Sequence, residues 1–447
     1  MKDRVTRKEK FCYILTNLGN VPVQAILGSY LLIYYTNVVG LNPGACATLF
    51  LIARIMDGLN DPIVGFLIDH RKTTKMGHFR PTLIMGAILC GLNFMLLWMG
   101  PYIATGGKLF IAYVSYLLIG IIFPIMDISL NSMLPVMTAD ASERNTLSSI
   151  KGITLLLGVF GINIIAPILI GNSSEAKGYF TLIIVAVFMI IVFSVIGTLG
   201  LKERVQINQE QKKYRFVDLI EIIKQKPVWS TFLCGLLYTT GTYIVNASNT
   251  YFYTYVLNNL MILSLASLIQ MFAMIPATIL APVLILKMGK KNAYIFGLFC
   301  FGIFPVVRII NVINIPILMI ATAVAGFGAG LSMPLQYSIQ ADNTDYVELK
   351  LGYRAEGAIA SLSSFITKCA MGIGGAIPGY LLAMVHFDPT MAEQAEGVKT
   401  MLTLCTIGCP ILFCVIAIVI FKAIYPISKE KLEEQNMAVS YTHLRAH

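Results

Sequence analysis

Three ionisable residues in one otherwise apolar segment could bind a cation. Arg54, Asp57 and Asp61 lie in the string ARIMDGLNDP, and their spacing places them on one face of a helix with Asn60 beside them. Two carboxylates one turn apart and an amide oxygen are hard oxygen ligands, which suit Na⁺. If one carboxylate is protonated, the same group can carry H⁺ instead. The spacing therefore predicts a cation site and leaves the choice between Na⁺ and H⁺ open.

Two further charges stand alone in apolar segments. Asp127 lies in the run 107–134 and Lys368 in the run 356–386. An ionisable side chain at the centre of a bilayer costs about 2.5–3.5 kcal/mol on insertion scales, so one that is retained suggests a function. The alternative for each charge is an ion pair that only holds helices together. For the three acids and two bases taken as a set, we favour function.

The composition requires that most of the outer surface faces lipid. The chain has 447 residues, of which 57% are hydrophobic and 13% are charged. A soluble domain carries roughly 25% charged residues, because its folded surface faces water. A soluble enzyme, a disordered regulator and a coiled coil are therefore excluded. The net charge of +10 is spread over loops and termini, so we expect no nucleic-acid partner.

Twelve apolar runs are long enough to cross about 30 Å of hydrocarbon. The longest polar interruption, 201–228, follows the sixth run, which predicts an all-α membrane protein with two six-helix halves, 1–200 and 229–427. Within this connector, 214–225 has apolar residues at helical spacing and is expected to form an amphipathic helix on the membrane, and Pro227 suits the entry to the seventh span. The runs are 11–36, 44–68, 80–100, 107–134, 148–171, 178–200, 229–256, 261–287, 292–312, 315–340, 356–386 and 398–425.

The basic residues predict the orientation in the membrane. Most of the 33 Lys and Arg occur at the N-terminus, in the loops after even-numbered runs, in the connector and near the C-terminus. Because Lys and Arg concentrate on the cytoplasmic side, we expect a multi-pass protein of the plasma (inner) membrane with both termini in the cytoplasm. Trp98 and Trp229 fall at predicted span ends, where aromatic side chains contact the membrane interface.

The C-terminal tail 428–447 ends in an unusual string. The letters VSYTHLRAH (439–447) resemble translated sequencing adapter. We expect this end of the cytoplasmic tail to be an artefact.

Motifs for enzymatic chemistry are missing from the sequence. It contains no GxxxxGK[ST], GxSxG or HExxH string, and its nine cysteines have no metal-ligand spacing. The five histidines form no catalytic grouping. We therefore expect no enzyme activity, no catalytic residues and no cofactor.

Several strings together resemble the glycoside–pentoside–hexuronide:cation symporters of the major facilitator superfamily. They are YYTNVVGL (34–41), ARIMDGLNDPIVG (53–65), GHFRP (77–81), MDISLNSMLP (126–135) and ADNTDYVELKLGYRAEG (341–357). The resemblance covers most of the chain. It implies the major facilitator fold, with twelve transmembrane helices in two six-helix halves, and transport by alternating access.

The resemblance also implies a cation site and a conformational latch. Asp57, Asn60 and Asp61 match the family's cation ligands, so they would hold the metal if the coupling ion is Na⁺, and Arg54 matches an arginine one turn before them. In the loop after the second span, Gly65, Asp69 and Arg71 approximate the G-x-x-x-D-[RK] latch of major facilitator transporters. Apart from the resemblance, this loop could be a simple basic turn.

The implied substrate site lies on other spans. Asp127 matches the family's sugar-binding acid, Lys151 its basic sugar ligand, and Lys368 the lysine that bridges the two sites. Asn20 occupies a position of the sugar site where the family presents a basic residue. Lys151 cannot reproduce the bidentate fork of an arginine.

The chain departs from the family pattern at several positions. Asn20 and Val21 replace a Lys-Asp pair, Asn131 replaces an aromatic sugar platform, and Pro124 replaces a threonine of the cation site. Specific binding of galactosides is therefore not expected. The substrate could be a hexuronide, a pentoside or an oligosaccharide.

The sequence thus predicts Na⁺- or H⁺-coupled symport of a sugar or glycoside by a monomer in the lipid bilayer. Two alternatives stay open. One is a symporter or exporter of a non-sugar acidic solute, which Arg54, Lys151 and Lys368 could attract. The other is a non-transporting membrane sensor with a transporter-like fold.

Overall fold

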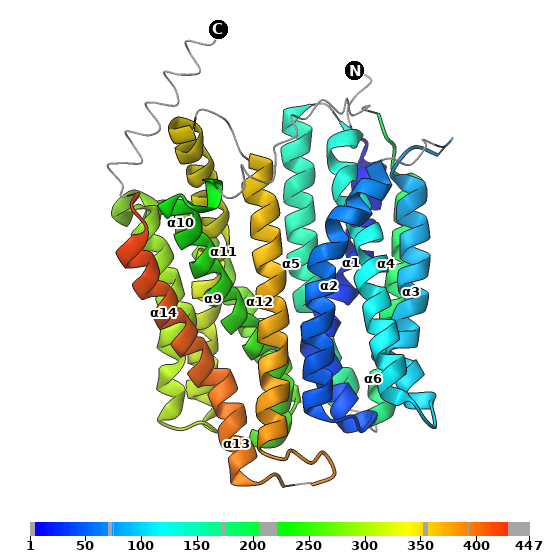
Figure 1. Cartoon of the computed structure of the whole chain (residues 1–447), viewed down its shortest axis with the longest axis vertical. Coiled ribbons are helices and arrows are strands. Elements are labelled where there is room, and N and C mark those ends of the chain that lie inside the picture. The colour runs from blue at the N-terminus through cyan, green and yellow to red at the C-terminus, as the bar shows by residue number, and fades with distance from the viewer. Residues whose placement is uncertain are drawn as a thin grey trace. The chain divides into compact units, whose positions relative to one another are not determined.

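The computed structural model describes residues 5–427 apart from 70–73, 75, 139, 172–174, 205–220, 352–355 and 392. This part of the chain is almost entirely helical and contains no strand (Figure 1). The α-helices are α1 (Arg7–Ile33), α2 (Pro43–Asp69), α3 (Arg80–Ile103), α4 (Lys108–Met137), α5 (Ala141–Gly171), α6 (Glu175–Phe188), α7 (Ser194–Gly200), α9 (Lys226–Tyr251), α10 (Met261–Leu298), α11 (Ile315–Leu351), α12 (Glu356–Met384), α13 (Glu396–Thr403) and α14 (Cys409–Ile424).

Short helical segments of other types continue several of these helices. Five are π-helical turns, in which the N–H of residue i+5 donates to the C=O of residue i and the backbone widens locally. They are η1 (Tyr34–Val38), η2 (Met189–Phe193), η3 (Phe252–Val256), η4 (Phe299–Ile303) and η6 (Leu404–Gly408), and η5 (Phe304–Ile309) is a 3₁₀-helix.

The helices follow the predicted apolar runs. Among the described residues, nine helical stretches are long and apolar enough to cross a membrane; α1 and α2 are not among them. One stretch, Met261–Ile309, breaks at Gly289, whose φ of 79° suits glycine, between the predicted eighth and ninth spans. Pro227 lies in the first turn of α9, as predicted, whereas most of the predicted connector helix 214–225 lies outside the described residues.

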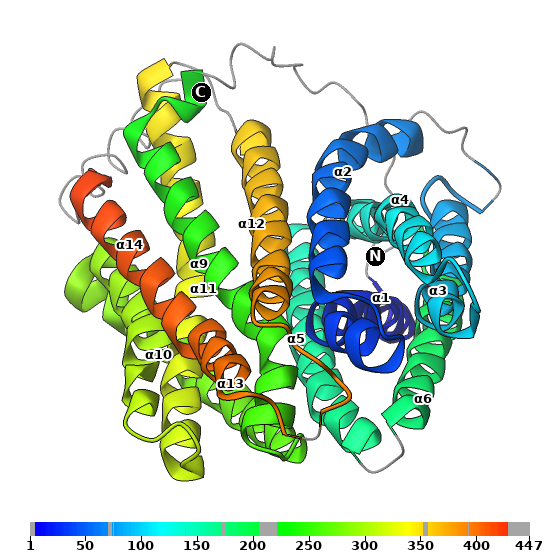
Figure 2. The ribbon, with the colours of Figure 1, turned by 60° about the horizontal axis from the view of Figure 1, so that its bottom comes forward.

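The chain divides into two compact units, each described by itself. Unit 1 contains residues 1–210, 249–265 and 379–398, and unit 2 contains the remainder of the chain. In unit 1, α3 packs along α4 (Figures 1 and 2), and α1 packs along α5 and α7. In unit 2, one apolar core joins α9, α10, α11 and α14.

Trp98 lies in the core of unit 1, so its side chain does not contact the membrane interface. Its side chain is fully buried, and its ring centroid is 4.9 Å from that of Tyr34 and 6.4 Å from that of Tyr179. The Tyr34 hydroxyl also donates to the backbone carbonyl of Trp98 at 2.7 Å. The interfacial prediction for Trp98 is therefore wrong, because this face of α3 packs against neighbouring helices.

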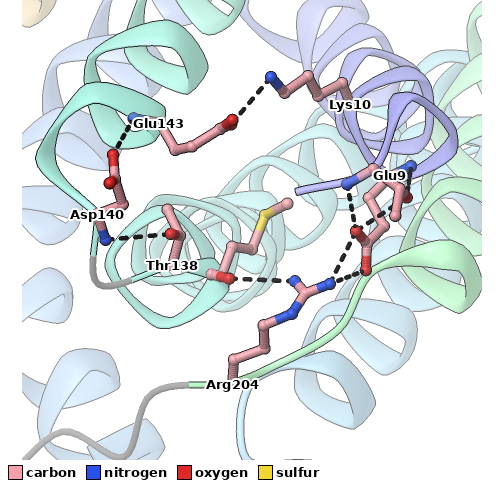
Figure 3. A network of polar contacts seen from close by, with 8 residues as sticks. Glu9, Lys10, Thr138, Asp140, Glu143 and Arg204 are labelled. Carbon is pink, nitrogen blue, oxygen red and sulfur yellow. Dashed lines mark hydrogen bonds and ion pairs between the residues drawn. The ribbon is translucent and has the colours of Figure 1, made fainter. Parts of the chain in front are cut away.

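A polar network holds the helix ends near the N-terminus of unit 1 together (Figure 3). The Arg204 guanidinium donates to both carboxylate oxygens of Glu9, at 2.7 and 2.9 Å, and to the backbone carbonyl of Met137 at 3.1 Å. Glu9 and Thr6 also cap the start of α1 reciprocally. Burial opposes ionisation of Glu9, but the hydrogen bonds from Thr6 and Arg204 outweigh it and lower the pKa of this carboxyl.

The residue before Arg204 stabilises the start of another helix. The Glu203 carboxylate accepts the backbone N–H groups of His78, Phe79 and Arg80 at 2.7, 2.9 and 2.9 Å. These are unpaired donors at the N-terminus of α3, where the helix dipole favours a negative charge. The segment after α7 therefore ties α1, α3 and α4 together.

We predict that Arg204→Gln destabilises the protein. The substitution leaves the buried Glu9 carboxylate without its cation, which costs about 2–3 kcal/mol. Thermal unfolding of the purified protein should show a Tm lower by roughly 2–6 °C, and Arg204→Lys should lose less.

The same pair predicts a pH dependence. Because the pKa of Glu9 is lowered in the folded state, the stabilisation is present above the ordinary glutamate value of 4.5 and is lost as the pH falls through the folded value. The difference in Tm between wild type and Arg204→Gln should therefore shrink in acid. A difference that stays constant below pH 4.5 would contradict this account.

Candidate functional site

The first polar group of the site is an ion pair on α2. Arg54 Nη1 lies 2.8 Å from Asp57 Oδ2, at a spacing of three residues on one helical face. Asp57 is 7% exposed, so its charge is largely removed from water. The second guanidinium nitrogen of Arg54 lies 3.4 Å from the hydroxyl of Tyr116 on α4, and Phe50 packs against the Tyr116 ring. The pair compensates two charges that would otherwise be costly to bury.

A glycine on α4 makes room for the Asp57 carboxylate. A Cβ added at Gly120 would overlap Asp57 Oδ1, far inside van der Waals contact. Gly120 and Tyr116 are four residues apart and therefore share one face of α4. The carboxylate thus sits directly against the backbone of α4 through Oδ1 and pairs with Arg54 through Oδ2.

The second polar group surrounds Asp127 on α4. Asn20 Nδ2, from α1, donates to Asp127 Oδ1 at 2.5 Å, and Asn131 Nδ2 donates to Asp127 Oδ2 at 3.0 Å. The Lys151 ammonium, from α5, donates to the amide oxygen of Asn131. Asn20 is buried and Asn131 is exposed. A lysine and a carboxylate are thus joined through one amide, next to an accessible polar surface.

For the remaining predicted residues, the structure describes the helix and in some cases the burial, but not the contacts of the side chains. Asn60 is half-buried on α2, and Lys368 is half-buried on α12 in unit 2. Asp61, Gly65 and Asp69 belong to α2, but their side chains lie outside the described part of the structure, as does all of Arg71. The complete cation set and the latch therefore stay predictions.

The structure adds three residues to those predicted. Asn131 was noted only as a departure from the family pattern, yet it links Lys151 to Asp127; its spacing of four from Asp127 was a usable signal. Tyr116 and Gly120 had no such signal, because only the packing of α4 on α2 brings them to Asp57.

Oxygen atoms dominate the possible ligands. Among the described residues, no three His, Cys, Asp or Glu side chains come together as a metal cluster. The described groups around Asp57 and Asp127 offer carboxylate, amide and hydroxyl oxygens. Such donors suit Na⁺, H⁺ or sugar hydroxyls better than a transition metal.

Residues 12–429 match the family described as MFS/sugar transport protein. This chain belongs to that family. It is 30% identical over 407 residues to the isoprimeverose transporter of Lactiplantibacillus pentosus, covering 89% of this chain and 84% of the relative. It is also 27% identical to the glucuronide carrier protein homolog of Escherichia coli (strain K12), covering 94% and 93%.

The fold is likewise that of known transporters. A bacterial homologue of the human lysosomal transporter Spinster superposes with a TM-score of 0.68 at 10% identity, covering 96% of this chain and 97% of that one. The predicted family and the helical membrane fold are therefore confirmed. This MFS protein is a multi-pass membrane transporter, and the number and boundaries of its twelve predicted spans stay predictions.

We predict that Gly120→Ala is strongly destabilising. The new methyl group would have to displace the Asp57 carboxylate or separate α2 from α4, and such overpacking costs about 1–3 kcal/mol. Gly161→Ala on α5 is the matched control, because nothing lies near an added Cβ there. Thermal unfolding of both variants provides the measurement, and equal Tm values would contradict the close approach of Asp57 to α4.

Proposed function

We propose that this transporter is a cation-coupled symporter of a sugar or glycoside that works by alternating access. The observation that supports it best is that unit 1 contains two separate carboxylates with different kinds of partner. One carboxylate is paired with an arginine on α2, and a second is held by two amides beside a lysine. The first arrangement suits a cation and the second suits hydroxyl groups. A relative named as an isoprimeverose transporter supports the sugar class.

Asp57 is the proposed centre of the cation site, with Asn60 and Asp61 as further oxygen ligands. Arg54 holds the Asp57 carboxylate when no cation is bound, because its nitrogen lies at hydrogen-bond distance. Na⁺ or H⁺ neutralises Asp57 and weakens its attraction for the guanidinium. Cation binding thereby changes the pairing of a buried charge, and with it the relative stability of the transporter's states.

Asp127 is the proposed sugar ligand, supported by Asn20, Asn131 and Lys151. Each oxygen of an ionised carboxylate can accept about two hydrogen bonds. Each Asp127 oxygen accepts one from an amide, which leaves capacity for substrate hydroxyls. The Lys151 ammonium has three N–H donors and uses one on Asn131. Lys368 stays a substrate-binding residue proposed from the family resemblance.

Coupling follows from the cost of moving unpaired charge. A transporter that carries the cation alone would enclose an uncompensated charge in an apolar cavity as it closes, which is unfavourable. The empty and the doubly loaded forms therefore reorient most readily. We further propose that the protein lies in the plasma (inner) membrane with both termini in the cytoplasm, because of the distribution of Lys and Arg. The monomeric state stays a prediction.

We predict that Asp57→Asn abolishes gradient-driven accumulation. Asparagine has no negative charge to bind a cation. Uptake should therefore fall by about tenfold or more when a Na⁺ or H⁺ gradient is imposed on proteoliposomes. Glu393→Gln is the control, because it removes an exposed carboxylate outside the apolar stretches. Equal accumulation by Asp57→Asn and wild type would refute the cation site.

A second candidate function is transport of an acidic solute. The observation that favours it is the ammonium of Lys151 beside the accessible Asn131. A relative named as a glucuronide carrier protein homolog points the same way. A substrate carboxylate could pair with Lys151 while its hydroxyls bind Asp127.

Substrate panels with two variants separate the candidates. Asp127→Asn should lower uptake of neutral glycosides and uronides alike, because both present hydroxyls. Lys151→Gln should lower uptake of uronides selectively, by about tenfold, because a charge-assisted hydrogen bond is lost. Uptake of radiolabelled sugars into proteoliposomes provides the measurement. An equal loss for both substrate classes in Lys151→Gln would count against the acidic solute.

A further inference from the structure

Two cysteines of unit 2 form a pair that the proposed function does not use. Cys405 lies in the π-helical turn η6, and Cys409 begins α14 directly after that turn. A spacing of four residues places both side chains on one face of a helix. Their thiols are in hydrogen-bond contact with each other. This spacing is none of the usual metal-ligand patterns of a sequence, so it is the helical conformation that brings the two sulfurs together.

A buried hydroxyl group faces the pair. Ser248, on α9, is fully buried, and its hydroxyl oxygen forms no hydrogen bond of acceptable geometry within the described residues. The side chain faces the Cys405 thiol. The packing of α9 on α14 explains this placement, because a Cβ added at Gly241, on the same face of α9, would lie 3.6 Å from Pro410 Cα. An unsatisfied buried hydroxyl is costly, so its direction toward a thiol indicates a ligand group that it can stabilise.

The two thiols differ in their access to solutes. Cys405 is 1% exposed, whereas Cys409 is half-buried. An ion can therefore bind Cys409 first and then reach the Cys405 sulfur beside it. Cys234 and Cys414 are fully buried in the apolar core of unit 2, so neither is open to an ion in the folded protein.

The apolar surroundings select the charge of the ligand. Thiolate sulfur is a soft ligand and prefers soft cations. A divalent cation that takes two thiolates forms a neutral complex, whereas Cu⁺ would leave a net negative charge that is costly to bury. Structural Zn²⁺ sites have four ligands, and the described groups here supply only two sulfurs and one hydroxyl. Hg²⁺ prefers two sulfurs in a nearly linear arrangement and therefore fits both the charge and the number of ligands.

We propose that Cys405 and Cys409 form a dithiol site that binds one soft divalent cation of the Hg²⁺ type, with Ser248 as a positioning residue. On binding, two S–H bonds break, two Hg–S bonds form and two protons pass to water, so no electron is transferred. The Ser248 hydroxyl donates to the Cys405 sulfur in the complex. The bound ion fixes Cys405, within η6, relative to the start of α14. The proposal uses none of the residues assigned to the coupling cation or the sugar, and it does not depend on the proposed transport.

Retention of mercury by the purified, reduced full chain tests the pair. The protein in detergent is incubated with one equivalent of HgCl₂ without oxygen, dialysed against excess 2-mercaptoethanol and analysed for bound mercury. A single thiol loses Hg²⁺ to an excess of monothiol, whereas two thiols on one helix compete through their effective concentration. Wild type should retain about one Hg²⁺ per chain, and Cys405→Ser and Cys409→Ser should each retain about tenfold less or lower still.

Two further variants separate the pair from single thiols. Cys369→Ser is the matched control, because Cys369 is half-buried like Cys409 but is the only cysteine of α12. This variant should retain as much mercury as wild type. Ser248→Ala removes one hydroxyl and should lower retention by about three- to tenfold. Thermal unfolding of each variant shows whether it is folded, and alanine replaces serine at any cysteine position where the serine variant is not.

Protection from alkylation locates the bound ion. Iodoacetamide applied to the folded protein should modify Cys409 when mercury is absent and leave it unmodified when mercury is bound, as read by peptide mass spectrometry. Modification of Cys409 in both samples would overturn the site. Mercury retention that is equal in wild type, Cys405→Ser and Cys409→Ser, or that is lost in Cys369→Ser, would also overturn it. Unchanged retention in Ser248→Ala would overturn the positioning role of the hydroxyl.

Discussion

The compensation of buried charge is the constraint on which the rest of the described site depends. A carboxylate buried among apolar helices is not solvated by water. Each buried acid therefore needs hydrogen-bonding or charged partners within contact distance. Asp57 has an arginine on its own helix, and Asp127 has two amides backed by a lysine. These two solutions differ in kind. Direct pairing fixes a charge against its opposite, whereas amide bonding stabilises a carboxylate and leaves part of its accepting capacity available.

The packing of unit 1 serves this compensation. Gly120 lets α4 approach the α2 carboxylate, and the burial of Asn20 on α1 brings an amide to Asp127. At the ends of the helices, charges are paired in a similar manner, with Arg204 on Glu9 and Glu203 on the first amides of α3. The membrane interior and the helix ends thus follow one rule, in which a polar group is retained only where the fold supplies its partner.

The features of this arrangement that depend on local spacing along the chain could be predicted from the sequence. Apolar run lengths placed most helices, and the spacing of Arg54 and Asp57 anticipated a shared face that the ion pair confirms. Prediction failed where the answer depended on which helices pack together. Trp98 lies at a span end in the sequence but in the core of the fold. Gly120 is one of 36 glycines, and nothing in its neighbourhood along the chain marks it as the neighbour of Asp57.

The amide of Asn131 gives the link between Lys151 and Asp127 a chemical direction. Its oxygen only accepts and its nitrogen only donates, and neither atom takes up or releases a proton at neutral pH. A hydroxyl or an imidazole in that place could hand a proton from the ammonium to the carboxylate, but a carboxamide cannot. Asn131 therefore transmits polarisation from the lysine to the carboxylate but does not allow a proton to pass between them.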